Sequence, residues 1–135
     1  MSQAVGPNLR GTDEGRGGWL PHPPYKVYTK LSDIVEPSPS RLWVLVDEHP
    51  DSINDAALAV QMKTSIKQTQ MIDYPASFHN GACGFAFADG HAEIHKWVDG
   101  RTKPPPKYNN SLALNVSQPN NPDIWWMIER TSTKQ

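Results

Sequence analysis

The sequence predicts an α+β fold, namely a small antiparallel sheet with long proline-rich loops and a short C-terminal helix. First, two strand-like segments flank the pair Asp89-Gly90, which is typical of a hairpin turn. Second, the chain has 13 prolines and a hydrophobic content of only 37%, which favours loops over long elements. Third, Asn121 and Pro122 form a helix start signal before an apolar-periodic stretch.

The length of 135 residues predicts one domain with a single core. Residues 1–18 contain five glycines and no hydrophobic period, so we expect a flexible N-terminal arm. The globular domain is predicted over residues 19–131, and residues 132–135 form a tail.

The first half of the domain is predicted to contain short elements between proline-rich loops. Residues 19–24 are stiffened by proline and extended. Residues 25–28 favour a short strand, and residues 30–35 a helical or turn segment. The run 41–46 is β-branched and aromatic without polar alternation, which predicts a central strand buried on both faces. Residues 56–60 favour a returning strand, although their alanines also suit a helix.

The hairpin follows a loop over residues 65–70. A type I′ turn is expected at Asp89-Gly90, because glycine adopts positive φ at little cost. Strand alternation places Phe85 and Phe87 on one face. The returning strand places four side chains on one face: His91, Glu93, His95 and Trp97.

The C-terminal part begins with a stiff proline segment over residues 103–107 and continues as a polar loop through residues 109–120. A helix is predicted from Pro122 to about Arg130, with Asn121 as its N-cap.

The net charge of −1 gives no overall electrostatic footprint for nucleic acid, so no such partner is expected. No stretch approaches the ~20 apolar residues of a membrane span, and no signal peptide is visible. These residues predict a chain without membrane contact, cytoplasmic if expressed as it stands. The single cysteine, Cys83, is interpreted as a buried, inert thiol.

One group of ionisable residues surrounds the hairpin. Alternate residues on a strand point the same way, so these side chains could converge on a metal ion that activates a water. They could equally form a solvated polar face with no chemistry. The group comprises His79, Asp89, His91, Glu93 and His95.

A second group lies in the acidic loop that follows the strand over residues 41–46. Oxygen-rich loops bind calcium, although Pro50 and the missing central glycine exclude an EF-hand. The alternative is a loop whose polar side chains cap its own turns. The candidate oxygen donors are Asp47, Glu48, Asp51, Asn54 and Asp55, and His49 lies within the same loop.

Three sequence stretches, 46–55, 73–81 and 87–97, resemble in content and order the bacterial prepilin-like family with the His-x9-Asp-Gly domain. That family is similar to the major pseudopilins of type II secretion, and the resemblance covers residues 19–131. It implies a pseudopilin-like head, normally packed on a long N-terminal helix in the inner membrane. Residues 1–18 lack such a helix, so we expect a fragment of such a protein.

The resemblance also implies a structural calcium ion, with zinc less favoured. The expected ligands are Asp89, Asp47, Asp51, Asp55 and His79. Expected partners are other pseudopilin-like subunits or the chain itself. The alternative function is a metal-dependent hydrolase of a small ester or lactone, in which Glu93 or Asp89 acts as base beside His91 and His95.

Overall fold

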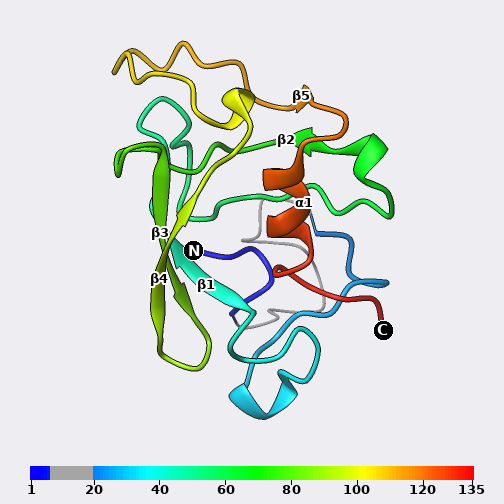
Figure 1. Cartoon of the computed structure of the whole chain (residues 1–135). Coiled ribbons are helices and arrows are strands. Elements are labelled where there is room, and N and C mark those ends of the chain that lie inside the picture. The colour runs from blue at the N-terminus through cyan, green and yellow to red at the C-terminus, as the bar shows by residue number, and fades with distance from the viewer. Residues whose placement is uncertain (7–19) are drawn as a thin grey trace.

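The computed structural model describes residues 1–6 and 20–135, which form two small antiparallel sheets and one short helix (Figure 1). The larger sheet has the strand order β1-β3-β4, and the smaller one pairs β2 with β5. The strands are β1 (Trp43–Val46), β2 (Gln70–Met71), β3 (Ala82–Phe87), β4 (Ala92–Lys96) and β5 (Val116–Ser117). The helix is α1 (Pro122–Ile128), and 3-10 turns occur at Leu31–Asp33, Ile66–Gln68 and Gly100–Thr102. The predicted α+β class with a C-terminal helix is confirmed.

The hairpin β3–β4 is present, but its turn differs from the predicted type I′. The N–H of Gly90 bonds to the carbonyl of Phe87 at 3.0 Å, and the N–H of Phe87 bonds to the carbonyl of His91 at 2.9 Å. Gly90 has φ of 92°, whereas Asp89 has no positive φ. The loop therefore has three residues, a type I turn closed by a glycine bulge, and only Gly90 needs the left-handed region.

The strand predicted over residues 41–46 is not central. β1 is the first strand of its sheet, and Leu45 is 56% exposed. Its apolar run predicts two buried faces, yet only one face is covered by the rest of the chain. The alternation predicted for β3 is confirmed, because Phe85 and Phe87 are both buried, with ring centroids 6.3 Å apart.

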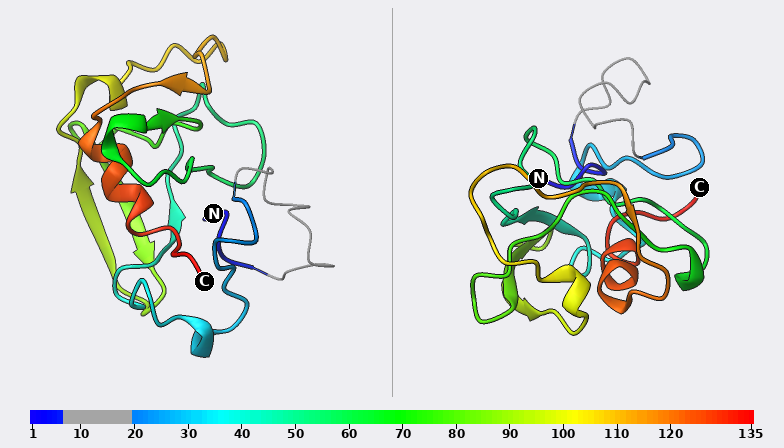
Figure 2. Two further views of the ribbon diagram at one scale, coloured as in Figure 1. Left: turned by 90° about the vertical axis from the view of Figure 1, so that its right-hand side faces the viewer. Right: turned by 90° about the horizontal axis from the view of Figure 1, so that it is seen from above.

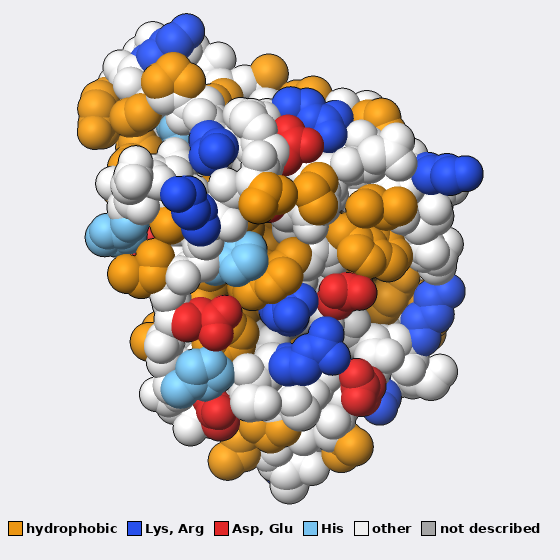
Figure 3. All heavy atoms as spheres, viewed as in Figure 1, with side chains coloured by type: hydrophobic (Ala, Val, Ile, Leu, Met, Phe, Trp, Pro, Cys, Tyr) orange, Lys and Arg blue, Asp and Glu red, His pale blue; other side chains and the backbone are white. Residues whose placement is uncertain are grey.

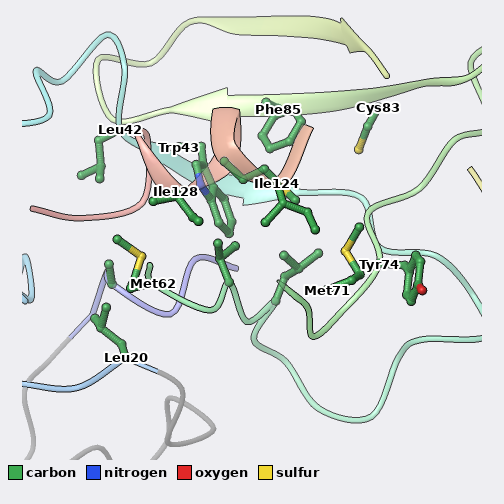
Figure 4. Packing of buried hydrophobic residues seen from close by; sticks show 14 of the residues in the cluster. Leu20, Leu42, Trp43, Met62, Met71, Tyr74, Cys83, Phe85, Ile124 and Ile128 are labelled. Carbon is green, nitrogen blue, oxygen red and sulfur yellow. The ribbon is translucent and has the colours of Figure 1, made fainter. Parts of the chain in front are cut away.

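The core lies between the inner face of this sheet, α1 and the segments on the far side of the helix (Figures 2 and 4). Trp43 of β1 is fully buried, and its ring meets that of Phe85 edge-on at 6.0 Å. Its indole N–H donates to the hydroxyl of Thr131 at 3.0 Å. Ile124 and Ile128 pack toward Trp43 from α1 (Figure 4). A few large aromatic side chains thus hold together a chain with little regular structure.

The helix begins as predicted. Asn121 is fully buried, and its side-chain oxygen accepts the N–H groups of Asp123 at 2.9 Å and Ile124 at 3.3 Å. Its amide nitrogen donates to Gln118 and Thr102, which lie outside the helix. The side chain of Asp123 accepts the N–H of Asp99 at 2.9 Å, which ties α1 to the end of β4.

Two other predicted strands are reduced to isolated bridges. Residues 25–28 pair only through Tyr28 with Val5 and Tyr25 with Lys134, and residues 56–60 pair only through Leu58 with Ser2. Each segment pairs with its neighbour through single residues, so no continuous ladder of backbone hydrogen bonds forms. The segments at 65–70 and 109–120, predicted as loops, contain a 3-10 turn and the short strands β2 and β5.

Neither end of the described chain matches the predicted arm and tail. Residues 1–6 pack into the fold: Ala4 is fully buried, and the N–H of Ser2 bonds to the carbonyl of Val44 at 2.9 Å. Residues 7–18 of the predicted arm lie outside the described residues. The tail is also bound, because the N–H of Lys26 bonds to the carbonyl of Thr133 at 2.9 Å. Ser2, Gln3 and Ala4 are all buried, which a glycine count does not predict.

None of the helices within residues 1–6 and 20–135 has the length and apolar content needed to cross a bilayer.

Candidate functional site

The turn of the hairpin brings together three of the predicted residues. The Nδ1 atom of His91 lies 2.5 Å from the carboxylate of Asp89, and its Nε2 atom lies 3.5 Å from that of Glu93. The imidazole ring stacks on Phe87 with centroids 4.4 Å apart. Histidine and acidic side chains follow one another on the hairpin side of the surface (Figure 3). This arrangement is a carboxylate–imidazole–carboxylate row.

The row favours a charged imidazole. The hydrogen bond that the His91 ring donates to Asp89 raises the pKa of His91 above its ordinary value, and Glu93 adds to this. The backbone N–H of His91 in turn holds the pKa of Asp89 below its ordinary value. A doubly protonated imidazole has no lone pair for a metal ion, and it cannot accept a proton. When protonated, His91 pairs with the carboxylates of Asp89 and Glu93.

The predicted convergence fails at His95. His95 lies four positions after His91 in the sequence, which along a strand is a distance of roughly 13 Å. Its ring stacks on Trp126 of α1 with centroids 3.8 Å apart, and burial lowers the pKa of His95. The guanidinium of Arg130 lies 4.3 Å from the centroid of the same Trp126 ring. His95 therefore belongs to the packing between the sheet and α1.

His79 also lies away from the turn. It precedes β3, whereas Asp89 follows it, so the two residues are at opposite ends of that strand. The backbone N–H of His79 bonds to the carbonyl of Ala82, and its side chain is exposed. The spacing between His79 and the Asp89-Gly90 pair therefore reflects the length of β3, which lies between two turns.

Asp51, in the acidic loop, is a buried structural anchor. Its carboxylate accepts the backbone N–H groups of Lys107 and Asn109, both at 2.7 Å, and of Asn110 at 3.0 Å. These bonds, Lys107 first, lower its pKa. His49 is fully buried beside it and bonds to the carbonyl of Pro104 at 2.9 Å. The two side chains fasten the proline segment to the loop after β1.

The other acidic side chains of the loop face different ways. Asp55 accepts the N–H of Ala57 at 2.7 Å and so caps its own turn. Asp47 lies beside Gly84 on the outer face of the sheet. Glu48 is half-buried, and burial raises its pKa to about 7. Burial likewise raises the pKa of Asp73, which accepts the N–H of Ala59, to about 6. Asp55 and Asp73 accept backbone N–H groups, whereas Glu48 accepts the hydroxyl of Ser52.

These positions give little support to the predicted calcium site. Among residues 1–6 and 20–135, no group of three or more His, Cys, Asp or Glu side chains is placed to hold a metal ion. The oxygens of Asp51 already accept three N–H groups, and Asp89 is paired with His91. The five expected ligands do not surround one point, and the calcium site stays a prediction.

Cys83 is fully buried in β3, and burial raises the pKa of its thiol to about 12. A thiol with such a pKa is protonated at neutral pH and is a poor nucleophile. This geometry agrees with the interpretation of Cys83 as an inert packing residue.

The outer face of the larger sheet carries a feature that sequence reasoning missed. Leu45 is 56% exposed and Ile94 is 67% exposed, on strands at opposite sides of this sheet. Between them lies a floor of the small residues Gly84, Ala86 and Ala92, which together with the two large side chains line a shallow groove of about 590 Å³. Asp47 and Glu93 lie at its borders. The alternation of β4 predicts that Ile94 and His95 point to opposite faces of the sheet. It does not predict that the face with Ile94 is exposed.

The two edge strands of this sheet, β1 and β4, differ in how their outer backbone groups are hydrogen-bonded. The edge of β1 is covered, because the carbonyl of Val44 accepts the N–H of Ser2, and the N–H of Trp43 bonds to the carbonyl of Arg130 at 3.3 Å. Among residues 1–6 and 20–135, β4 pairs with β3 alone, and the lower part of the β3–β4 hairpin lies at the left of Figure 1. The surface formed by Leu45, Gly84, Ala86, Ala92 and Ile94, together with the free edge of β4, is called the outer surface below.

With this geometry in hand, comparison of the chain with protein families, with curated proteins and with solved structures finds no match.

Proposed function

We propose that this protein is a structural subunit, a pseudopilin-like head domain that acts by docking its outer surface onto another subunit of a pilin-like assembly. The observation that carries the proposal is the outer surface itself. Two large apolar side chains, Leu45 and Ile94, stand exposed above a floor of small residues. Apolar surface of this kind is costly in water and marks interaction sites.

The polar groups of the molecule support the same reading. The buried side chains of His49, Asp51 and Asn121 are bonded to the backbone or to neighbouring amides and hydroxyls. They stabilise loops that have little regular structure. Such a frame can hold the outer surface in one conformation for a partner.

The alternative function, a metal-dependent hydrolase of a small ester or lactone, draws on Asp89, His91 and Glu93. It has weaker support, because both ring nitrogens of His91 face carboxylates and His95 is stacked on Trp126. A hydrolytic centre needs a neutral imidazole facing the metal.

Site-specific photo-crosslinking in the cells that make the protein tests the proposal. A photoreactive phenylalanine analogue is placed at Leu45 or Ile94, and at the 71% exposed Val35 as a matched control. We expect adducts with a pilin-like subunit, or with a second copy of this chain, from positions 45 and 94 but not from 35. Equal labelling at all three positions would contradict the docking function. Metal-dependent ester or lactone turnover abolished by His91→Ala would favour the hydrolase.

A further inference from the structure

Within the described part of the chain, the edge of β4 that faces away from β3 has no pairing strand. The bonds between Phe87 and His91 and between Trp97 and Gly81 fix which residues of β4 face β3. By alternation, Glu93 and His95 direct their N–H and C=O groups to β3, whereas Ala92, Ile94 and Lys96 direct theirs outward. Unpaired backbone groups on a strand edge are a template for another strand.

We propose that the protein forms a symmetric dimer in which β4 pairs antiparallel with β4 of a second copy. The inference rests on the proposed docking function and names its partner and contact. A two-fold axis perpendicular to the sheet passes beside Ile94, so that Ile94 faces Ile94 of the second copy. Ala92 then pairs with Lys96 of the second copy, and the two sheets join into one.

The pairing of Glu93 with His95 favours this register over its neighbours. With Ile94 opposite itself, Glu93 of each copy lies opposite His95 of the other, an acid beside an imidazole that can donate a hydrogen bond. Moving the two-fold axis by one residue, which slides the strands by two, places Glu93 opposite Glu93 in one direction and His95 opposite His95 in the other. Two carboxylates directly opposite on a sheet repel each other, and two imidazoles forgo the contact with the acid.

The apolar groove supports the same partner. A two-fold axis perpendicular to the sheet keeps both outer faces on one side. The exposed side chain of Ile94 therefore packs against its counterpart, and the two grooves adjoin. Paired β4 strands also satisfy the outward N–H and C=O groups of three residues on each copy. Both the side chains and the backbone of the edge gain partners in one contact.

Single-cysteine cross-linking tests the register. In the proposed pairing the two Cα atoms at position 94 lie roughly 5.5 Å apart, within reach of a disulfide. We expect Ile94→Cys to form a disulfide-linked dimer on mild oxidation. Ala92→Cys is the matched control on the same strand and face: its two copies lie roughly 13 Å apart and stay unlinked. The native Cys83 is fully buried and does not compete.

Sedimentation over a range of concentrations tests the association without any cross-link. The unmodified protein is expected to shift toward dimer as its concentration rises to about 1 mM, and Glu93→Lys to shift less because it removes the carboxylate that faces His95 of the other copy. Monomeric sedimentation throughout, or equal cross-linking of Ile94→Cys and Ala92→Cys, would overturn the proposal. If Ile94→Cys stays monomeric while position 94 photo-crosslinks to a different subunit, self-pairing fails and the docking function stands. If neither the dimer nor the photo-crosslink at position 94 is observed, both the self-pairing and the docking function are wrong.

Discussion

The carboxylate of Asp51 accepts the backbone N–H of Lys107 at 2.7 Å, across 56 residues of sequence. Through this bond and those to Asn109 and Asn110, one buried side chain fixes where a proline-rich segment without regular structure lies. The loop after β1 owes its order to internal hydrogen bonds of this kind.

Replacing Asp51 should loosen that segment. In Asp51→Asn one oxygen becomes an N–H₂ group, so a donor faces the N–H of Lys107 and the charge that strengthens the remaining bonds is lost. We expect a fall of several degrees in melting temperature and faster amide hydrogen exchange at positions 107, 109 and 110. Asp55→Asn is the matched control, because its single bond to Ala57 uses one oxygen that the amide retains. Equal effects of the two substitutions would contradict the anchoring role.

Stability should depend on pH through Glu48. Burial raises its pKa from 4.5 to about 7. Between these values the folded protein holds a proton that the unfolded chain has released, so the free energy of unfolding falls as pH rises through this window. Asp73, with a pKa of about 6, acts in the same direction.

Glu48→Gln should remove part of this dependence. The amide keeps an oxygen that can accept the hydroxyl of Ser52, which bonds to Glu48 at 3.0 Å. We expect the variant to melt a few degrees higher than the unmodified protein at pH 8 and to differ little at pH 5. Thermal melts across this range provide the measurement, with the exposed Glu36→Gln as control. A variant that melts lower at pH 8 would argue against a buried, protonated Glu48.

The charge of His91 should depend on its neighbour. The hydrogen bond that His91 donates to the carboxylate of Asp89 raises the pKa of His91, so Asp89→Asn is expected to lower that pKa toward the ordinary value. Glu93→Gln should have a smaller effect, because Glu93 lies 3.5 Å from the ring and Asp89 only 2.5 Å. An NMR titration of the imidazole protons measures both. An unchanged pKa in Asp89→Asn would mean that the pair does not persist in solution.

Gly90 should be the sensitive glycine of the hairpin. It has φ of 92°, and a Cβ placed there meets nothing within 4 Å, so the cost of Gly90→Ala comes from the backbone alone. We expect a loss of about 1–2 kcal/mol in the free energy of unfolding. Gly100→Ala is the matched control, with equally open space and no positive φ. Denaturant melts compare them, and similar losses would show that the turn does not impose the cost.

Local signals predicted the elements that depend on neighbouring residues. The Asp-Gly pair located the hairpin, and Asn121-Pro122 located the start of α1, because a turn and an N-cap are formed by a few adjacent residues. The predicted type I′ turn was wrong because an Asp-Gly pair fits two kinds of turn. Both residues have positive φ in one kind, and only the glycine has positive φ in the other. The predicted central strand was wrong because the apolar run of residues 41–46 cannot show that Leu45 lacks a cover.

The candidate site was predictable only in part. Alternation along a strand brought His91 and Glu93 to one face, as the structure shows. It could not show that His95 turns to Trp126, since that contact depends on where α1 packs. The backbone N–H groups that Asp51 accepts lie 56 to 59 residues away in the sequence, so no local sequence pattern predicts these hydrogen bonds.

The order in which the chain is synthesised has a consequence for how the fold closes. The hydroxyl of Ser132 donates to the carbonyl of Lys26 across 106 residues, and the indole of Trp43 bonds to Thr131 across 88. During translation, β1 and the segment around Lys26 therefore wait for residues 131–133 to emerge from the ribosome. Until then Trp43 can pack on Phe85 of β3 but lacks its bond to Thr131, so the core around β1 closes late in synthesis.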